Sequence, residues 1–88
     1  MPTVAFTPHL QHYLPVAPVP CRSLILRALL DEAFAAYPAG RLYVLDEQGR
    51  VRRHIAIFVD GMLQDREKLD IPLRPDSSIY IMQALSGG

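Results

Sequence analysis

A single segment of this sequence, Leu24–Tyr37, has the periodicity of a long amphipathic helix. The apolar side chains that share one helical face are Leu26, Leu29, Leu30, Ala33, Phe34 and Tyr37. Ser23 is the expected N-cap, and Pro38 and Gly40 are expected to end the helix. Because one helix covers only one face of a sheet, any strands in this chain should form an α+β layer with the helix on one side.

Short apolar and β-branched runs on both sides of this helix predict strands. These runs are Thr3–Thr7, Val16–Cys21, Leu42–Leu45, Val51–Val59 and Ile79–Gln83. Pro18 and Pro20 cannot donate ladder hydrogen bonds, so we expect the second run at a sheet edge.

Turn-forming residues separate these runs, and the stretch Met62–Leu73 is polar and irregular. The expected turns are Asp46–Gly49, Asp60–Gly61 and Arg74–Ser77. The predicted fold class is α+β, with a mixed sheet of four to five strands and one main helix packed on one face. If the first and last strands pair in parallel at the centre, this is the β-grasp arrangement.

With 88 residues the chain has room for one domain, expected to be residues 1–83, with residues 84–88 as a flexible C-terminal tail. Nine basic residues balance nine acidic ones, which gives little attraction for nucleic acids or anionic membranes. The opening segment before Arg22 is uncharged but rich in proline, which argues against a membrane span or signal peptide. The one cysteine, Cys21, can form no internal disulfide, and this favours a cytoplasmic setting.

The sequence closes on Gly87-Gly88, directly after a predicted strand and a short uncharged spacer. Glycine has no side chain to clash with a narrow channel and reaches backbone angles closed to other residues. The Gly88 carboxylate is unreactive by itself, but activation by ATP would give an acyl-adenylate that a sulfur nucleophile can attack. Such chemistry needs no catalytic side chain on the chain itself, so we expect a co-substrate of other enzymes and not an enzyme.

Three stretches of the sequence resemble the MoaD/ThiS family of ubiquitin-like sulfur carriers. They are HIAIFVDG (His54–Gly61), LDIPLRPDSSIYI (Leu69–Ile81) and QALSGG (Gln83–Gly88). The resemblance implies a β-grasp fold with no bound cofactor and adenylation of Gly88 by an E1-like enzyme of the MoeB/ThiF kind, which uses ATP. It further implies conversion to a thiocarboxylate by a sulfurtransferase or other sulfur donor, and delivery of sulfur to an acceptor synthase by a monomer or heteromeric complex.

Two departures from the family pattern concern the acceptor and one turn. Molybdopterin-synthase small subunits often carry Pro-Pro where this chain has Met82-Gln83, and the spacer Ala84-Leu85-Ser86 is closer to carriers that serve cysteine biosynthesis. The usual Pro-Gly-Asp turn is replaced by Pro75-Asp76-Ser77. Molybdopterin, thiamin, cysteine, thiolated tRNA and a secondary metabolite all stay open as destinations of the sulfur.

A second candidate site is the sheet face that the helix leaves open. Phe58, Tyr80 and Met82 are predicted to point to this face, and Leu85 and Ser86 follow in the spacer. Ubiquitin-like proteins dock on activating enzymes through this kind of surface, so the resemblance favours a partner-docking role for these residues.

Other charged and histidine clusters have simpler interpretations. His9, His12 and His54 are expected in exposed loops and not at a metal site, which usually needs four ligands. Asp65, Glu67 and Asp70 have no accompanying nucleophile and are expected to be solvated loop residues. The basic run Arg50, Arg52, Arg53 and His54 is either a solvated strand end or a docking site for an acidic partner patch.

Three further functions stay open beside the sulfur carrier. The chain could be the small subunit of a molybdopterin-synthase-like complex, or a ubiquitin-like modifier attached to lysines through its C-terminus. It could also be a β-grasp adaptor with an inert tail. Lys68 is the only lysine, which makes extensive chains of the protein on itself improbable.

Overall fold

The computed structural model describes residues 1–83 of the chain. In chain order its elements are β1 (Thr3–Phe6), the 3-10 helix η1 (Pro8–His12), β2 (Val19–Pro20), α1 (Leu26–Phe34), α2 (Pro38–Val44), β3 (Ile55–Val59), β4 (Met62–Leu63) and β5 (Ser78–Gln83). No helix in this range is long and apolar enough to cross a membrane.

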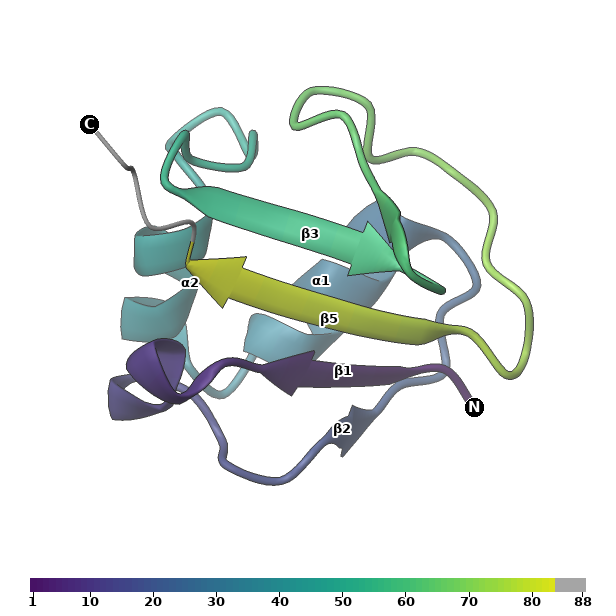
Figure 1. Cartoon of the computed structure of the whole chain (residues 1–88), viewed down its shortest axis with the longest axis horizontal. Coiled ribbons are helices and arrows are strands. Elements are labelled where there is room, and N and C mark those ends of the chain that lie inside the picture. Colours follow the sequence, from purple (N-terminus) through teal and green to yellow (C-terminus); the bar gives the residue numbers. More distant parts are fainter. Residues whose placement is uncertain (84–88) are drawn as a thin grey trace.

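The strands form one mixed sheet in the order β2-β1-β5-β3-β4. The first and last strands, β1 and β5, pair in parallel, while the other neighbours are antiparallel. In Figure 1 the arrows of β1 and β5 point the same way, β3 runs opposite, and α1 lies behind the sheet. The predicted α+β fold with its parallel central pair is confirmed.

The core lies between α1 and the covered face of the sheet. Strands β3 and β5 alternate between buried and more exposed residues, as expected for strands with one covered face. The buried strand residues that face this layer are Val4, Phe6, Ile55, Ile57, Val59, Ile79 and Ile81. Five residues of the predicted helical stripe meet them, and all five are buried: Leu26, Leu29, Leu30, Ala33 and Phe34.

The start of α1 differs from the prediction. The helix begins at Leu26 with Ile25 as N-cap, and no side chain caps it. The hydroxyl of Ser23 instead donates to Glu32 Oε1 at 3.0 Å. The hydroxyl and the backbone N–H of Ser23 both donate to the Glu32 carboxylate, so Ser23 is not the N-cap.

The prediction of a strand at Leu42–Leu45 is wrong, because residues 42–44 belong to the second helix, α2. Pro38 starts this helix and does not merely end the first, as suits a residue with no N–H to donate and a fixed φ. Gly40 is buried inside α2, where its missing side chain admits Leu14. Close packing therefore explains this glycine, which the sequence pattern treats as a helix breaker.

Several strand limits also differ. Within the predicted strand Val51–Val59, the strand β3 begins only at Ile55. Val51 forms an isolated bridge to Leu45, and a turn separates it from β3. Strand β4 occupies the start of the stretch expected to be irregular. The turn between β3 and β4 has two residues with positive φ, Asp60 and Gly61, at 50° and 84°. Such angles at both central positions define the tight hairpin turn that favours Asp-Gly.

The remaining predictions at the sheet margins agree with the structure. The proline-rich run Val16–Cys21 contributes only the two residues of β2, at a sheet edge. The turn Arg74–Ser77 closes with a hydrogen bond from the Ser77 N–H to the Arg74 carbonyl at 3.0 Å.

Candidate partner-binding site around the end of strand β5

Strand β5 is the central element that carries the chain toward its C-terminal glycines. It pairs with β1 on one side and β3 on the other and ends at Gln83. Both neighbours fix its direction and register. The predicted site residues Leu85, Ser86, Gly87 and Gly88 lie outside the described residues, as does the predicted tail 84–88.

The open face of the sheet carries a row of apolar side chains in register across four strands. Tyr80 of β5 lies opposite Ala5 of β1 and Phe58 of β3, and Phe58 lies opposite Leu63 of β4. Tyr80 is 42% exposed and Leu63 65% exposed. Met82 follows in the next row, opposite Ala56. Phe58, Tyr80 and Met82 therefore share one face, and their docking role stays a prediction.

Four aromatic rings lie in a row at the end of β5 and form what we call the aromatic strip: His12, Tyr13, Tyr43 and His54. Successive ring centroids are separated by 5.0, 5.3 and 5.2 Å. The Tyr43 hydroxyl donates to Gln83 Oε1 at 3.1 Å, which ties the strip to the last residue of β5. In Figure 1, α2 lies beside the arrowhead of β5.

The opposite end of β5 is held by a carboxylate. Asp60 Oδ1 accepts the Ser78 N–H at 2.9 Å, and Oδ2 accepts the Ser77 hydroxyl at 3.0 Å and lies 3.3 Å from the Arg74 guanidinium. These donors, the Ser78 N–H first, hold the pKa of the Asp60 carboxyl below its usual value. Asp60 therefore stays charged and joins the turn before β5 to the β3–β4 hairpin.

The single cysteine and the predicted loop carboxylates take no part in this site. Cys21 is fully buried, and burial followed by the charge of Glu32 raises the pKa of its thiol. Among residues 1–83 no three His, Cys, Asp or Glu side chains gather as metal ligands would.

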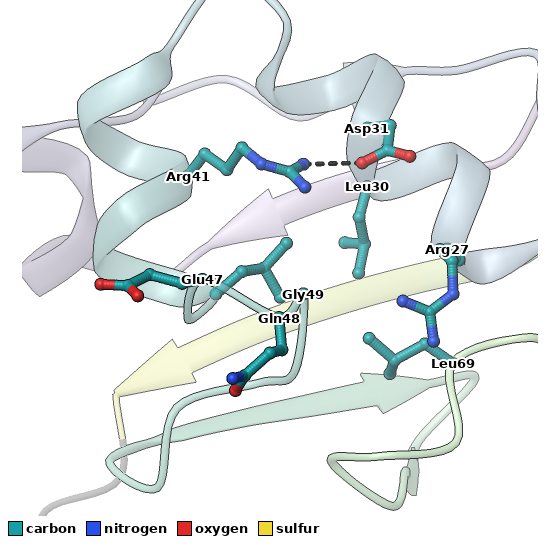
Figure 2. Close-up of a pocket in the computed structure, with 9 residues that line it drawn as sticks. Arg27, Leu30, Asp31, Arg41, Glu47, Gln48, Gly49 and Leu69 are labelled. Atoms are coloured by element: carbon teal, nitrogen blue, oxygen red, sulfur yellow. Dashed lines mark hydrogen bonds and ion pairs between the residues drawn. The ribbon is translucent and has the colours of Figure 1, made fainter.

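A polar hollow of about 320 Å³ lies on the helix side, between α1, α2 and the turn before β3. Figure 2 shows the Arg41 and Asp31 side chains joined at its rim, at 2.6 Å. Arg27, also at the rim, pairs with Asp70 at 2.7 Å. Because its arginines are paired within the chain and it lies behind the sheet, we assign it no role in the site.

The sequence pattern does not identify Tyr43 or Leu63 as site residues. It predicts a strand at Tyr43, so nothing indicates that the Tyr43 hydroxyl reaches Gln83. It predicts an irregular stretch at Leu63, although Asp60-Gly61 is a strong signal for a hairpin whose second arm would contain this residue.

No protein-family model matches this chain, and no curated protein matches it significantly. Solved structures do share its architecture. The Amycolatopsis orientalis BexX/CysO complex has a chain 15% identical over 100% of both chains, with a TM-score of 0.82. Mycobacterium tuberculosis CysO is 19% identical, with 97% of this chain and 100% of that chain covered and a TM-score of 0.81.

The small archaeal modifier protein 1 from Methanosarcina acetivorans is 21% identical, with 99% and 95% of the two chains covered and a TM-score of 0.80. The chain therefore has the ubiquitin-like β-grasp fold. Its structural neighbours include CysO and a small archaeal modifier protein, and this fold agrees with the β-grasp fold that the MoaD/ThiS resemblance implies.

Proposed function

We propose that this protein is a sulfur carrier whose reactive group is the carboxylate of Gly88. The observation that carries the proposal is the fold: a β-grasp domain, shared with CysO, whose central strand β5 leads to Gly87-Gly88. Partner enzymes then recognise the folded domain, and the chain is their co-substrate.

The proposed chemistry has two steps. An E1-like enzyme of the MoeB/ThiF kind joins the Gly88 carboxylate to the α-phosphate of ATP and releases pyrophosphate. Hydrosulfide then attacks the acyl carbon and releases AMP. Alternatively, a persulfide attacks, releases AMP and leaves an acyl disulfide, whose S–S bond a thiol cleaves with formation of a second disulfide. The product is a Gly88 thiocarboxylate, which gives its sulfur to an acceptor synthase.

The open sheet face suits the recognition that this chemistry needs. Tyr80 and Met82 lie on β5, the strand that leads to the tail, and Phe58 lies on the neighbouring β3. Leu63 extends the face on β4, at the sheet edge beyond β3. Burial of exposed aromatic rings is a common source of binding energy at protein interfaces. We propose that this face binds the activating enzyme while Leu85 and Ser86 lead Gly87 and Gly88 into its active site.

The proposal is tested by reconstitution. The chain is incubated with the E1-like enzyme of its source organism, ATP and sulfide, and its intact mass is measured. A gain of about 16 Da, one oxygen exchanged for sulfur, is the expected product. Deletion of Gly88 should abolish the gain, while Lys68→Arg, a conservative change on a surface loop, should leave it intact. Absence of the heavier species with an active enzyme would overturn the proposal.

A second candidate function is a ubiquitin-like modifier, favoured by the structural likeness to small archaeal modifier protein 1. The same acyl-adenylate would then be attacked by a lysine amine, with release of AMP and formation of an isopeptide bond. Peptides from other proteins with Gly-Gly on a lysine, present only when Gly88 is intact, would support this function. A stable stoichiometric complex with a large subunit would instead support the small-subunit alternative.

A further inference from the structure

The acidic residues of the chain are placed unevenly about the sheet. The nine acidic residues are Asp31, Glu32, Asp46, Glu47, Asp60, Asp65, Glu67, Asp70 and Asp76. None of them belongs to β1, η1, α2, β3 or β5 or to the segment Val51–His54 that leads into β3. The elements that meet at the end of β5 therefore carry no carboxylate side chain.

Basic side chains lie at this same end. Ile55, the first residue of β3, pairs with Gln83, the last residue of β5, so Arg52, Arg53 and His54 immediately precede the position where β5 ends. Within residues 1–83, neither Arg52 nor Arg53 forms a salt bridge, whereas Arg50 pairs with Asp46 at 3.0 Å. The Nε of Arg52 donates to the Leu42 carbonyl at 2.7 Å, which fixes this arginine against α2.

The aromatic strip lies among these charges and is already ordered. Tyr13 is 45% exposed, yet its ring packs against His12 on one side and Tyr43 on the other. Rings held by packing and by the Tyr43–Gln83 hydrogen bond lose little conformational entropy when a partner covers them. Aromatic and arginine side chains are also the residues most enriched at the energetic centres of interfaces.

We propose that the aromatic strip, with Arg52 and Arg53, is a second docking surface that receives an acidic segment of the activating enzyme. The inference rests on the proposed function for the identity of this partner. The strip is distinct from the row on the open sheet face, since it lies at the end of the sheet. The positive charges of Arg52 and Arg53 would speed encounter with an acidic surface of the enzyme. They would also orient the chain so that its C-terminal segment faces the enzyme.

The test compares two charge reversals in ATP–pyrophosphate exchange by the E1-like enzyme of the source organism, with this chain as the varied substrate. Arg53→Glu reverses a charge beside the strip, and Lys68→Glu makes the same change in net charge on the loop after β4. Both residues are exposed, so the fold should be kept, which circular dichroism checks. At low ionic strength we expect Arg53→Glu to lower kcat/KM about tenfold through KM, with kcat unchanged.

Lys68→Glu should stay within about twofold of the wild type, and the deficit of Arg53→Glu should shrink as salt is added. Equal kinetics of the two variants, with an active wild type, would overturn the docking surface alone. An inactive wild type would overturn the proposed function and this inference with it. Binding of tRNA that Arg53→Glu abolishes while enzyme kinetics stay unchanged would assign the surface to RNA instead.

Discussion

The two ends of β5 use their polar groups in opposite ways. At its start, the Asp60 carboxylate, the Ser77 hydroxyl and the Arg74 guanidinium contact one another. At its end, rings and arginines lie together, and the elements that meet there carry no carboxylate side chain. Within residues 1–83 this end has the Tyr43–Gln83 hydrogen bond and the bond from Arg52 Nε to the Leu42 carbonyl. Polar groups that hydrogen-bond or form ion pairs within the chain stabilise the fold, whereas polar groups without an internal partner are available to other molecules. The polar groups of the first end should therefore contribute mainly to stability, and those of the second mainly to recognition.

The largest effect should come from Gly40→Ala in α2, because it disturbs the packing beneath the aromatic strip. The new methyl group would overlap the Leu14 side chain and lie 3.0 Å from the Tyr13 carbonyl oxygen. We expect a loss of about 2 kcal/mol in the free energy of unfolding, measured by urea denaturation, as for overpacked cores.

The same variant can be checked by a double-mutant cycle. Leu14→Ala removes the atoms that the new methyl group would meet, so Gly40→Ala should cost clearly less in that background. If the two costs simply add, contact with Leu14 is not the reason for the glycine, and the account of α2 is wrong.

A smaller effect is expected at the start of β5. The Ser77 hydroxyl is buried, donates to Asp60 and accepts the Arg74 N–H at 2.8 Å. Ser77→Ala should lower the free energy of unfolding by about 1–2 kcal/mol and leave ATP–pyrophosphate exchange unchanged. Ser78→Ala is the matched control, since Ser78 is exposed and bonds Asp60 through its backbone N–H. A loss of exchange activity in folded Ser77→Ala would break the division between the two ends.

The Asp60 cluster also predicts a pH dependence. Hydrogen bonds lower the pKa of Asp60 in the folded state, so the charged carboxylate stabilises the fold above the unfolded-state pKa. This contribution is lost as the pH falls from the unfolded-state pKa, 3.8 for Asp, through the lower folded pKa. Asp60→Asn should show a flatter stability profile below about pH 4 in urea titrations. Parallel profiles for the two proteins would contradict the role given to Asp60.

The smallest effect should come from Tyr43→Phe at the end of β5. It removes one hydroxyl from a partly buried hydrogen bond and keeps the ring stacking, so we expect a loss of about 1 kcal/mol or less. Thermal unfolding measures this loss. The variant should keep more exchange activity than Tyr43→Ala, which removes the ring, and equal activities would argue against a role for the ring.

The helix-on-sheet layer and the faces of β5 could be predicted, because periodicity and turn residues report local structure directly. The parallel pairing of β1 and β5 followed only from the family resemblance. The features that could not be predicted depend on tertiary contacts between segments distant in the sequence. Pro38 and Gly40 signal a helix end by local rules, yet a proline also suits a first helical turn and Leu14 needs the room at the glycine. Ser23 has the chemistry of an N-cap, but Glu32 takes its hydroxyl.

The candidate site shows the same limit. The alternation in Ile79–Gln83 was enough to place Tyr80 and Met82 on the open face, opposite Ile79 and Ile81. No sequence pattern indicates the aromatic strip, whose rings come from three segments that meet only in the folded chain. The glycines and their chemistry were inferred from sequence and stay a prediction, since residues 84–88 lie outside the described structure.

The central claim is that the Gly88 carboxylate is the reactive group and that the folded domain is the part recognised by partner enzymes. Its most direct test is mass spectrometry of the C-terminal peptide from protein isolated from cells that also express the E1-like enzyme. The account predicts a peptide that ends at Gly88, with a fraction about 16 Da heavier as the thiocarboxylate. A peptide that continues beyond Gly88, or only the unmodified carboxylate beside an active enzyme, would contradict it.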